Sequence, residues 1–424
     1  MSEALNKLAM NGGERAIKHP LPARRHFGAE ERAAALRVID AAIEAGGAPG
    51  YGGNEEILFC EEFAAMLGGG YCDAVNSGST AVFVGLRALE IEPFSEIIIG
   101  PVNDPGGMMP IVMMNCIPVV ADSDKDSFNI SLESIKERVT PLTSAIVVPH
   151  IAGEPADIEN ICNFAKSKGL KVVEDCAQAH GAYLNGKPVG TFGDTGAFSL
   201  MFGKHTCVGG QGGMIFTKSE DIYWKVRQNS DRGKPFGLPP GSENCVGTLN
   251  FNMDDLHCAI GREQIKKTKI IADGRRRVVG GIMERIREYL ADIPALRMTK
   301  LPEGAEASYW FMRLLLDTSY VTCDKSTFVT ALAAEGVPCG GRYGATPYTG
   351  SWYTDRHVFG TSGYPWASPD YKGDKDKIYT LADVPNAAKA IDETFIVNMY
   401  ESWQDINIVE FALAVKKIYE AYKK

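Results

Sequence analysis

The sequence lacks the features that mark a secreted or membrane-bound chain. None of its ten cysteines forms a C-x-x-C pair, and most of them lie within apolar runs such as VMMNCIPVV. No apolar stretch approaches the roughly 20 residues that a membrane-spanning helix needs. The first twenty residues, MSEALNKLAMNGGERAIKHP, contain no apolar signal-peptide core. Scattered thiols without either signal predict a cytoplasmic protein with reduced cysteines.

Positive charge and metal-binding motifs are also scarce. The formal net charge is -9, which opposes broad attraction to nucleic acid or anionic lipid. The seven histidines show no ligand spacing such as H-E-x-x-H, so no metal is expected. No G-x-G-x-x-G follows an early strand, which disfavours a dinucleotide-dependent oxidoreductase. We therefore expect small metabolites as partners, with no nucleic acid and no membrane.

The sequence does contain enough apolar residues for two domains, with 45% hydrophobic residues in 424. From about residue 55 to 220, the apolar runs EIIIGP, IPVVAD, SAIVVPH and KVVED alternate with amphipathic segments, and AFSL and GGMIFT follow as further strand candidates. This alternation is typical of parallel strands joined by crossover helices. A helical region at 253 to 293 precedes a mixed segment. We expect an N-terminal segment with a helix (1-54), a large α/β domain (55-272) and a smaller C-terminal α+β domain (273-424).

An apolar strand ends in acidic residues in VVEDCAQAHGA, residues 172 to 182. Ligands in open α/β sheets bind at such carboxyl ends, so Asp175 is expected to face a pocket. A carboxylate there can pair with the protonated ring nitrogen of pyridoxal 5'-phosphate (PLP), and the protonated ring accepts electrons. Nucleotide, metal or structural roles explain an acidic residue at a strand end at least as often.

A lysine lies between two strand candidates in AFSLMFGKHTCVGGQGGMIFT, residues 197 to 217. If burial or nearby cations lower the pKa of Lys204, its neutral amine can attack an aldehyde. A solvated surface charge is the commoner role of a lysine. The GGQGG turn that follows has the spacing of neither a Walker loop nor a dinucleotide loop.

A small polar turn opens directly into a helix in AVNSGSTAVFVGLRALEI, residues 74 to 91. The free N–H groups and the positive helix end at Gly78 and Ser79 can hold a phosphate. An ordinary helix N-cap explains the same residues equally well.

Together the three segments resemble the DegT/DnrJ/EryC1/StrS family of PLP-dependent sugar aminotransferases. The family's motifs S-G-T, E-D-x-A-Q-x-x-G and S-x-x-x-x-K followed by G-x-G-G occur here in the same order, as SGS, EDCAQAHG and SLMFGK followed by GGQGG. The resemblance extends over nearly the whole chain. It implies the fold-type I architecture of PLP transferases, in which a mostly parallel central sheet has helices on both faces and a smaller α+β domain follows.

The resemblance also implies roles for individual residues. Lys204 would carry PLP as a Schiff base and act as the general base, and Asp175 would pair with the ring nitrogen. Gln178 would hydrogen-bond near the ring hydroxyl. Three residues would bind the phosphate: Gly78, Ser79 and Ser199. Asn250, in a segment similar to the family's N-[YF]-R-M-[ST]-[DE]-L-Q-A-A-x-G, would reach the phosphate bound by the neighbouring subunit, which implies a homodimer with shared active sites.

The activity that the resemblance implies is transfer of an amino group from glutamate or glutamine to a keto-sugar or keto-cyclitol. A second branch of the family has histidine in place of the lysine and removes a hydroxyl group. His205 is adjacent, but counting from Ser199 places Lys204 at the family's lysine position, which favours transamination. The alternatives are a PLP-dependent sugar dehydratase of the same family and a non-catalytic regulatory relative. The presence of both Lys204 and Asp175 argues against the latter.

The chain departs from the family pattern at a few positions. Asn252 and His257 stand where the family usually has Arg and Gln, and Ser79 replaces Thr. Asp104 and Pro105 occupy the positions of a Thr and of a ring-stacking aromatic residue, so Asp104 is expected to contact substrate instead. Substrate choice is expected to depend on the loops at 345 to 380 and 233 to 241. The candidate binders of a carboxylate or phosphate are Arg232, Arg313 and Arg342.

Overall fold

A seven-stranded sheet forms the centre of the protein. The computed structural model describes residues 3–291, 293–343 and 345–424. The strand order in the large sheet is β1-β9-β8-β5-β4-β2-β3, and β9 is the one strand of this sheet that runs antiparallel to its neighbours. Its strands are β1 (Tyr71–Val75), β2 (Glu96–Ile99), β3 (Ile117–Val120), β4 (Thr143–Pro149), β5 (Lys171–Asp175), β8 (Thr195–Ser199) and β9 (Gly213–Thr217).

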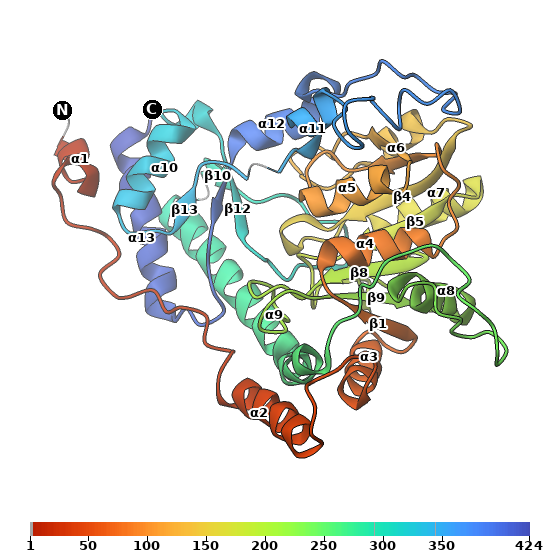
Figure 1. The fold of residues 1–424 in the computed structure, drawn as a ribbon. Helices are drawn as coiled ribbons and strands as arrows, with labels where there is room; N and C mark the ends of the chain where they lie inside the picture. Colours follow the sequence, from red (N-terminus) through yellow and green to blue (C-terminus); the bar gives the residue numbers. More distant parts are fainter. Residues whose placement is uncertain (1–2, 292, 344) are drawn as a thin grey trace.

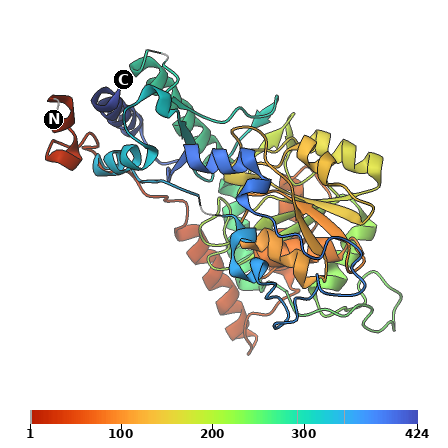
Figure 2. The same ribbon diagram turned by 90° about the horizontal axis from the view of Figure 1, so that it is seen from above.

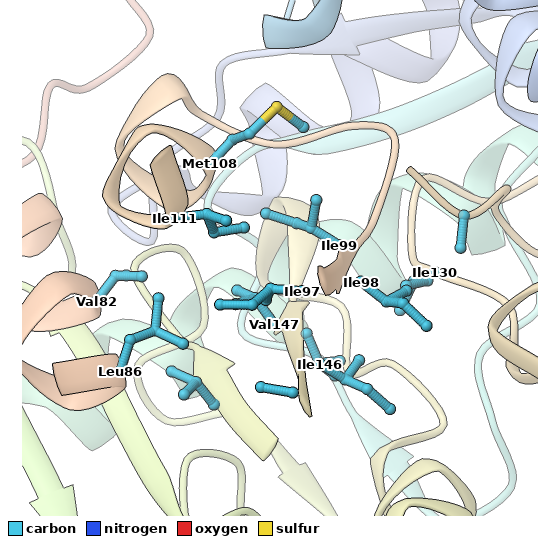
Figure 3. Packing of buried hydrophobic residues seen from close by; sticks show 14 of the residues in the cluster. Val82, Leu86, Ile97, Ile98, Ile99, Met108, Ile111, Ile130, Ile146 and Val147 are labelled. Carbon is cyan, nitrogen blue, oxygen red and sulfur yellow. The ribbon is translucent and has the colours of Figure 1, made fainter. Parts of the chain in front are cut away.

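Helices cover the large sheet, as Figure 1 shows. They are α4 (Gly78–Arg87), α5 (Pro105–Met113), α6 (Leu132–Arg138), α7 (Ile158–Lys168) and α8 (Glu220–Ser230). Every residue of β2 and β3 is buried, which explains why these strands are unbroken apolar runs in the sequence. In Figure 3, Val82 and Leu86 of α4 and Ile111 of α5 lie beside Ile97 of β2 and Val147 of β4. The predicted α/β class with a mostly parallel central sheet is confirmed.

A second core lies around a four-stranded antiparallel sheet, in the order β10-β12-β14-β13. The strands are β10 (Leu296–Arg297), β12 (Met312–Leu316), β13 (Cys339–Gly340) and β14 (Thr394–Val397), and the helices beside them are α10 (Lys325–Ala334), α12 (Pro385–Glu393) and α13 (Asp405–Tyr422). The long helix α9 (Asp255–Tyr289) joins the two cores, and its second half contributes Val278, Ile282 and Ile286 to the second one. The predicted boundary between 272 and 273 falls inside α9, and the domain division stays a prediction.

The N-terminal segment runs along both cores. It contains α1 (Glu3–Asn6) and α2 (Ala29–Glu44), and α3 (Asn54–Met66) begins where it ends; both α2 and α3 pack against α9. Leu8 is buried in the second core. Figures 1 and 2 show α1 beside α13, away from the large sheet. In the described part of the chain, no helix is both long and apolar enough to cross a bilayer.

The aromatic segment at 345 to 380 returns to the large sheet. Tyr348, Tyr353, Trp366 and Tyr371 are buried in the same core as β2 and β4. The Tyr371 hydroxyl donates to Glu96, the first residue of β2, at 2.8 Å. The segment contains α11 (Ser351–Thr354). The remaining elements are a small sheet of β6 (Tyr183–Leu184), β7 (Lys187–Pro188) and β11 (Ala305–Glu306), and the 3-10 turns η1 (Ala9–Asn11), η2 (Ile151–Gly153), η3 (Thr318–Tyr320), η4 (Pro347–Thr349) and η5 (Leu381–Asp383).

Candidate active site

A cavity of about 180 Å³ lies at the carboxyl ends of β4, β5 and β8, where the first turns of α4 and α5 also meet. Open α/β sheets bind their ligands at this edge. Six of the seven residues singled out from the sequence line this cavity: Gly78, Ser79, Asp175, Gln178, Ser199 and Lys204. The seventh, Asn250, lies on the surface and does not line it.

Lys204 is the cationic side chain at the centre of the cavity. The residue is only 7% exposed, and its Nζ lies 3.9 Å from the centroid of the Trp310 ring. Burial lowers the pKa of Lys204 to about 8, while the carboxylates of Asp175 and Asp104 oppose the shift. A substantial fraction of this amine is therefore neutral near physiological pH and available as a nucleophile or base.

We expect the Lys204 amine of the cofactor-free protein to react with a small acylating reagent with a midpoint near pH 8. Below that pH the amine carries a proton and has no free lone pair, whereas above it the neutral form dominates. Mass spectrometry of the peptide that contains Lys204 measures the extent of reaction at each pH. In the protein unfolded by urea, the midpoint should move to about 10.4, the value of an ordinary lysine. A folded-state midpoint above about 10 would contradict the lowered pKa.

Asp175 faces Lys204 from the end of β5. Its Oδ1 accepts a hydrogen bond from the Ala177 N–H at 3.0 Å. Burial raises the pKa of Asp175, whereas the Ala177 N–H and Lys204 act to lower it. A Cβ on Gly107 would lie 2.9 Å from Asp175 Oδ2, so glycine at this position allows α5 to approach the carboxylate closely. The site thus contains a buried carboxylate for which a cationic partner is favourable.

The start of α4 forms the other wall of the cavity. Ser77 is its N-cap and accepts from the Thr80 N–H at 3.1 Å, and the first turn leaves further N–H groups without helical partners. A Cβ on Gly78 would lie 2.5 Å from Ser199 Cβ, so only glycine lets the helix end meet β8 this closely. Because N–H groups at a helix end attract anions, this wall suits a phosphate.

Gln178 is held at both ends of its amide. Its Oε1 accepts from the Ala152 N–H at 2.7 Å, and its Nε2 donates to the Tyr343 hydroxyl at 2.7 Å. Tyr343 lies 165 positions away in the chain, and no local signal in the sequence indicates this contact. The orientation of the Gln178 amide is therefore fixed beside the cavity, while its contact with a ring hydroxyl stays a prediction.

Several cavity residues had no local signal in the sequence. His150 and Trp310 both line the cavity, from the end of β4 and from the segment before β12. His150 Nδ1 accepts from the Ala156 N–H at 3.0 Å, so the hydrogen of the neutral ring lies on Nε2, which donates to Glu174 at 3.1 Å. His150, Glu174 and Cys176 offer ligand atoms within 4.8 Å of one another. The ring nitrogens already have protein partners, and the expectation of no metal stays a prediction.

The sequence also suggested residues that the structure places elsewhere. Arg313 forms a buried ion pair with Glu154, and Arg232 pairs with Asp231 at the surface. Arg342 is exposed, and none of these three arginines lines the cavity. Asp104 does line it, with its Oδ1 held by the Gly106 N–H at 2.9 Å. The loops at 233 to 241 and 345 to 380 contribute no lining residue.

The residues of this cavity fit PLP. The amine suits its aldehyde, the carboxylate suits its ring nitrogen, and the helix end suits its phosphate. A site of this chemistry at the carboxyl edge of a mostly parallel sheet defines a PLP-dependent transferase of fold-type I. The model of the DegT/DnrJ/EryC1/StrS aminotransferase family matches residues 31–365. The chain belongs to this family, and it is a PLP-dependent aminotransferase.

Known proteins similar to this chain agree with that assignment. GDP-perosamine synthase of Vibrio cholerae is 31% identical over 262 residues, which are 62% of this chain and 69% of that protein. UDP-N-acetyl-3-dehydro-alpha-D-glucosamine 3-aminotransferase of Acidithiobacillus ferrooxidans is 30% identical over 285 residues, 67% of this chain and 73% of that protein. The crystal structure of an aminotransferase from Psychrobacter cryohalolentis has the same fold, with a TM-score of 0.80, 24% identity, and coverage of 95% of this chain and 98% of that one.

Proposed function

We propose that this enzyme moves an amino group from glutamate or glutamine to a keto-sugar or keto-cyclitol, with Lys204 as the cofactor anchor and proton carrier. The observation that carries the proposal is one cavity that holds a buried amine, a buried carboxylate and a helix N-terminus. Two relatives named for nucleotide sugars, which are similar over about two thirds of this chain, support a sugar-like acceptor.

Each of these groups has a distinct task in the proposed reaction. When bound, PLP supplies an aldehyde that takes up the substrate nitrogen and a ring that accepts electrons from the neighbouring carbon. Lys204 Nζ holds the cofactor and, once free, moves a proton at the reacting carbon, for which a pKa of about 8 is suitable. Asp175 keeps the ring nitrogen protonated, and the first turn of α4 binds the phosphate. The Trp310 ring beside Lys204 Nζ limits the access of water to the amine.

The position of His205 favours transamination over dehydration. His205 is fully buried, does not line the cavity, and its Nε2 donates to the Ser308 carbonyl at 3.0 Å. Lys204 is the side chain that reaches the cavity. Because the family's dehydratases use a histidine where the lysine otherwise stands, this arrangement supports an aminotransferase.

A substrate panel tests the proposed reaction. The purified enzyme is incubated with PLP, with glutamate or glutamine, and with a series of keto-sugars, their nucleotide conjugates and keto-cyclitols. Formation of the 2-oxo acid together with an amino product is the expected result for one acceptor class. A product that has lost a hydroxyl group and gained no nitrogen would identify the enzyme as a dehydratase instead.

We also propose that Asp104 contacts the hydroxyl groups of the acceptor, since its carboxylate faces the cavity beside Lys204.

We further propose a cytoplasmic homodimer with shared active sites. Phe202 and Leu249 are 67% and 68% exposed, and each lies close in sequence to a proposed site residue, Lys204 or Asn250. Apolar side chains this exposed are typical of a surface that a partner covers. Asn250 Oδ1 accepts from the Asn252 amide at 2.6 Å and points to no group of the cavity, which agrees with a role toward a neighbouring subunit.

Mixed dimers test the shared site. Lys204→Ala and Asn250→Ala are each expected to be impaired alone, while their co-expression should restore about a quarter of the wild-type activity. Half of randomly assembled dimers are mixed, and one of their two sites then has both an intact Lys204 and an intact Asn250. Light scattering should give twice the 46.0 kDa of one chain. A mixture that shows only the average of the two single variants would argue for sites built within one chain.

A further inference from the structure

A buried carboxylate, Glu401, lies between the N-terminal segment at Arg24 and the α9 residue Arg275. Glu401 Oε2 accepts from Arg275 Nε at 2.9 Å, and both side chains are 2% exposed. Glu401 Oε1 lies 3.6 Å from Arg24 Nε and 3.7 Å from His26 Nε2, and it has no hydrogen-bond partner within the described residues. A buried charge is costly unless it has partners, so this group of charges calls for an explanation.

Arg24 contacts the backbone at Lys204, the proposed cofactor lysine. The guanidinium of Arg24 donates one hydrogen bond to the Lys204 carbonyl and another to the His205 carbonyl. Two parallel donors on one rigid group restrain both peptide units. Since the first of these peptide units is bonded to the Lys204 Cα and the second follows it directly, Arg24 fixes the direction from which the amine enters the cavity.

Arg275 contacts the backbone at Trp310, whose ring lines the same cavity. Arg275 Nη1 donates to the Tyr309 carbonyl at 2.9 Å and to the Trp310 carbonyl at 2.7 Å. Trp310 in turn places its ring 3.9 Å from Lys204 Nζ and donates from Nε1 to the Gly203 carbonyl at 3.2 Å. One carboxylate is thus linked through two arginines to the two backbone segments that surround one amine.

The helix α9 packs closely against Glu401. A Cβ on Gly274, the residue before Arg275 in α9, would lie 2.7 Å from Glu401 Cβ. Arg24 and Glu401 both lie outside residues 31–365, which the family model matches. Two of the three charged residues of the link therefore come from the terminal segments of this chain, while Arg275 lies in α9 within the matched range.

We propose that Glu401 is a positioning residue for amino transfer, which holds Lys204 and Trp310 in place through Arg24 and Arg275. The proposal rests on the proposed role of Lys204. Removal of the carboxylate leaves two arginines without their common partner, and one of them is fully buried. The segments that they hold are then free to move apart, and water gains access to the Lys204 amine.

The variant Glu401→Gln keeps the shape and removes the charge. We expect kcat to fall ten- to a hundredfold, because small displacements of a reacting group have effects of this size. The KM values of both substrates should stay within about twofold, since Glu401 does not line the cavity. In the cofactor-free protein, the midpoint of Lys204 acylation should rise from near pH 8 toward the ordinary lysine value of about 10.4, because water relieves the burial that lowers the pKa.

Glu410→Gln is the matched control. Glu410 is also a buried carboxylate near the C-terminus, and it also holds the N-terminal segment, by accepting from the Lys18 and His19 N–H groups at 3.2 Å and 3.1 Å. It contacts neither Arg24 nor Arg275. We expect it to lower thermal stability while kcat and the Lys204 midpoint stay unchanged.

A double variant tests whether the residues act along one path. The losses of kcat in Arg24→Gln and Glu401→Gln should not multiply when the two are combined. Glu410→Gln has no kcat loss of its own, so adding it to Arg24→Gln should leave kcat at the value of Arg24→Gln alone. Arg24→Gln also serves as the direct test if Glu401→Gln does not fold.

Two results would overturn the proposal. One is a Glu401→Gln protein with lowered thermal stability but unchanged kcat and midpoint, and the other is an Arg24→Gln protein with both unchanged. An active Lys204→Ala enzyme would instead refute the proposed function itself.

Discussion

Lys204→Ala is expected to lower the rate of amino transfer by at least about 10³-fold, since a positioned general base alone contributes up to about 10⁴-fold. The variant also loses the group that holds the cofactor covalently. Among the described residues, no other lysine lines the cavity, so no neighbouring amine replaces Lys204. Formation of the 2-oxo acid measures the rate, and the visible absorption of the PLP-loaded protein measures attachment.

Two further lysine variants separate the possible causes of this loss. Lys204→Arg keeps the positive charge, but a guanidinium does not become a neutral nucleophile in a protein, so we expect it to be as inactive as Lys204→Ala. Lys171→Ala removes a partly exposed lysine that pairs with Asp194 at 3.5 Å, and it should leave activity unchanged. An unchanged visible spectrum in Lys204→Ala would show that another group holds the cofactor.

Much of the fold could be predicted because the parallel strands are buried on both faces. The runs EIIIGP, IPVVAD, SAIVVPH and KVVED became β2, β3, β4 and β5, and the predictions of strands at AFSL and GGMIFT are confirmed as β8 and β9. The order of strands could not be predicted, because pairing depends on contacts between distant segments. The insertion of the antiparallel β9 between β1 and β8 has no local signal.

The residues of the cavity also divide into those with a local signal in the sequence and those brought in by contacts between distant segments. Asp175, Lys204 and the turn at Gly78 and Ser79 could be singled out because they end a strand, follow one or begin a helix, and such ends meet at one edge of a parallel sheet. Gln178 and Ser199 could be named only through the family resemblance. Trp310, Tyr343 and Arg24 reach the site from distant segments, through contacts that no periodicity encodes. The aromatic segment at 345 to 380, which the sequence suggests as a determinant of substrate choice, contributes no residue to the cavity, and its buried rings pack against the large sheet of the same chain.

Asp175→Asn is expected to lower kcat at least about 100-fold. Breaking a buried ion pair costs about 3 to 5 kcal/mol, and each 1.4 kcal/mol on a barrier is about a factor of ten. The amide keeps the size of the carboxylate and can still accept from the Ala177 N–H, so the change is mainly one of charge. Asp194→Asn is the control, because Asp194 also accepts a backbone N–H, that of Val172 at 2.8 Å, outside the cavity. An Asp175→Asn enzyme with full activity would show that the ring nitrogen needs no carboxylate.

The same variant should stabilise the cofactor-free protein. Burial raises the pKa of Asp175 in the folded state, so between its ordinary pKa and the raised value the folded chain binds a proton that the unfolded chain has released. The sign follows from this linkage: as pH rises through that window toward neutrality, the free energy of unfolding decreases. Asn carries no charge and avoids this cost, so the melting temperature of cofactor-free Asp175→Asn at pH 7 should exceed that of the wild type, and the difference should shrink as the pH is lowered. Because a cationic ring nitrogen compensates the carboxylate, saturating PLP should stabilise the wild type more than the variant. A variant with lower activity and an equal or lower melting temperature would show that Asp175 is not held at a cost in the cofactor-free fold.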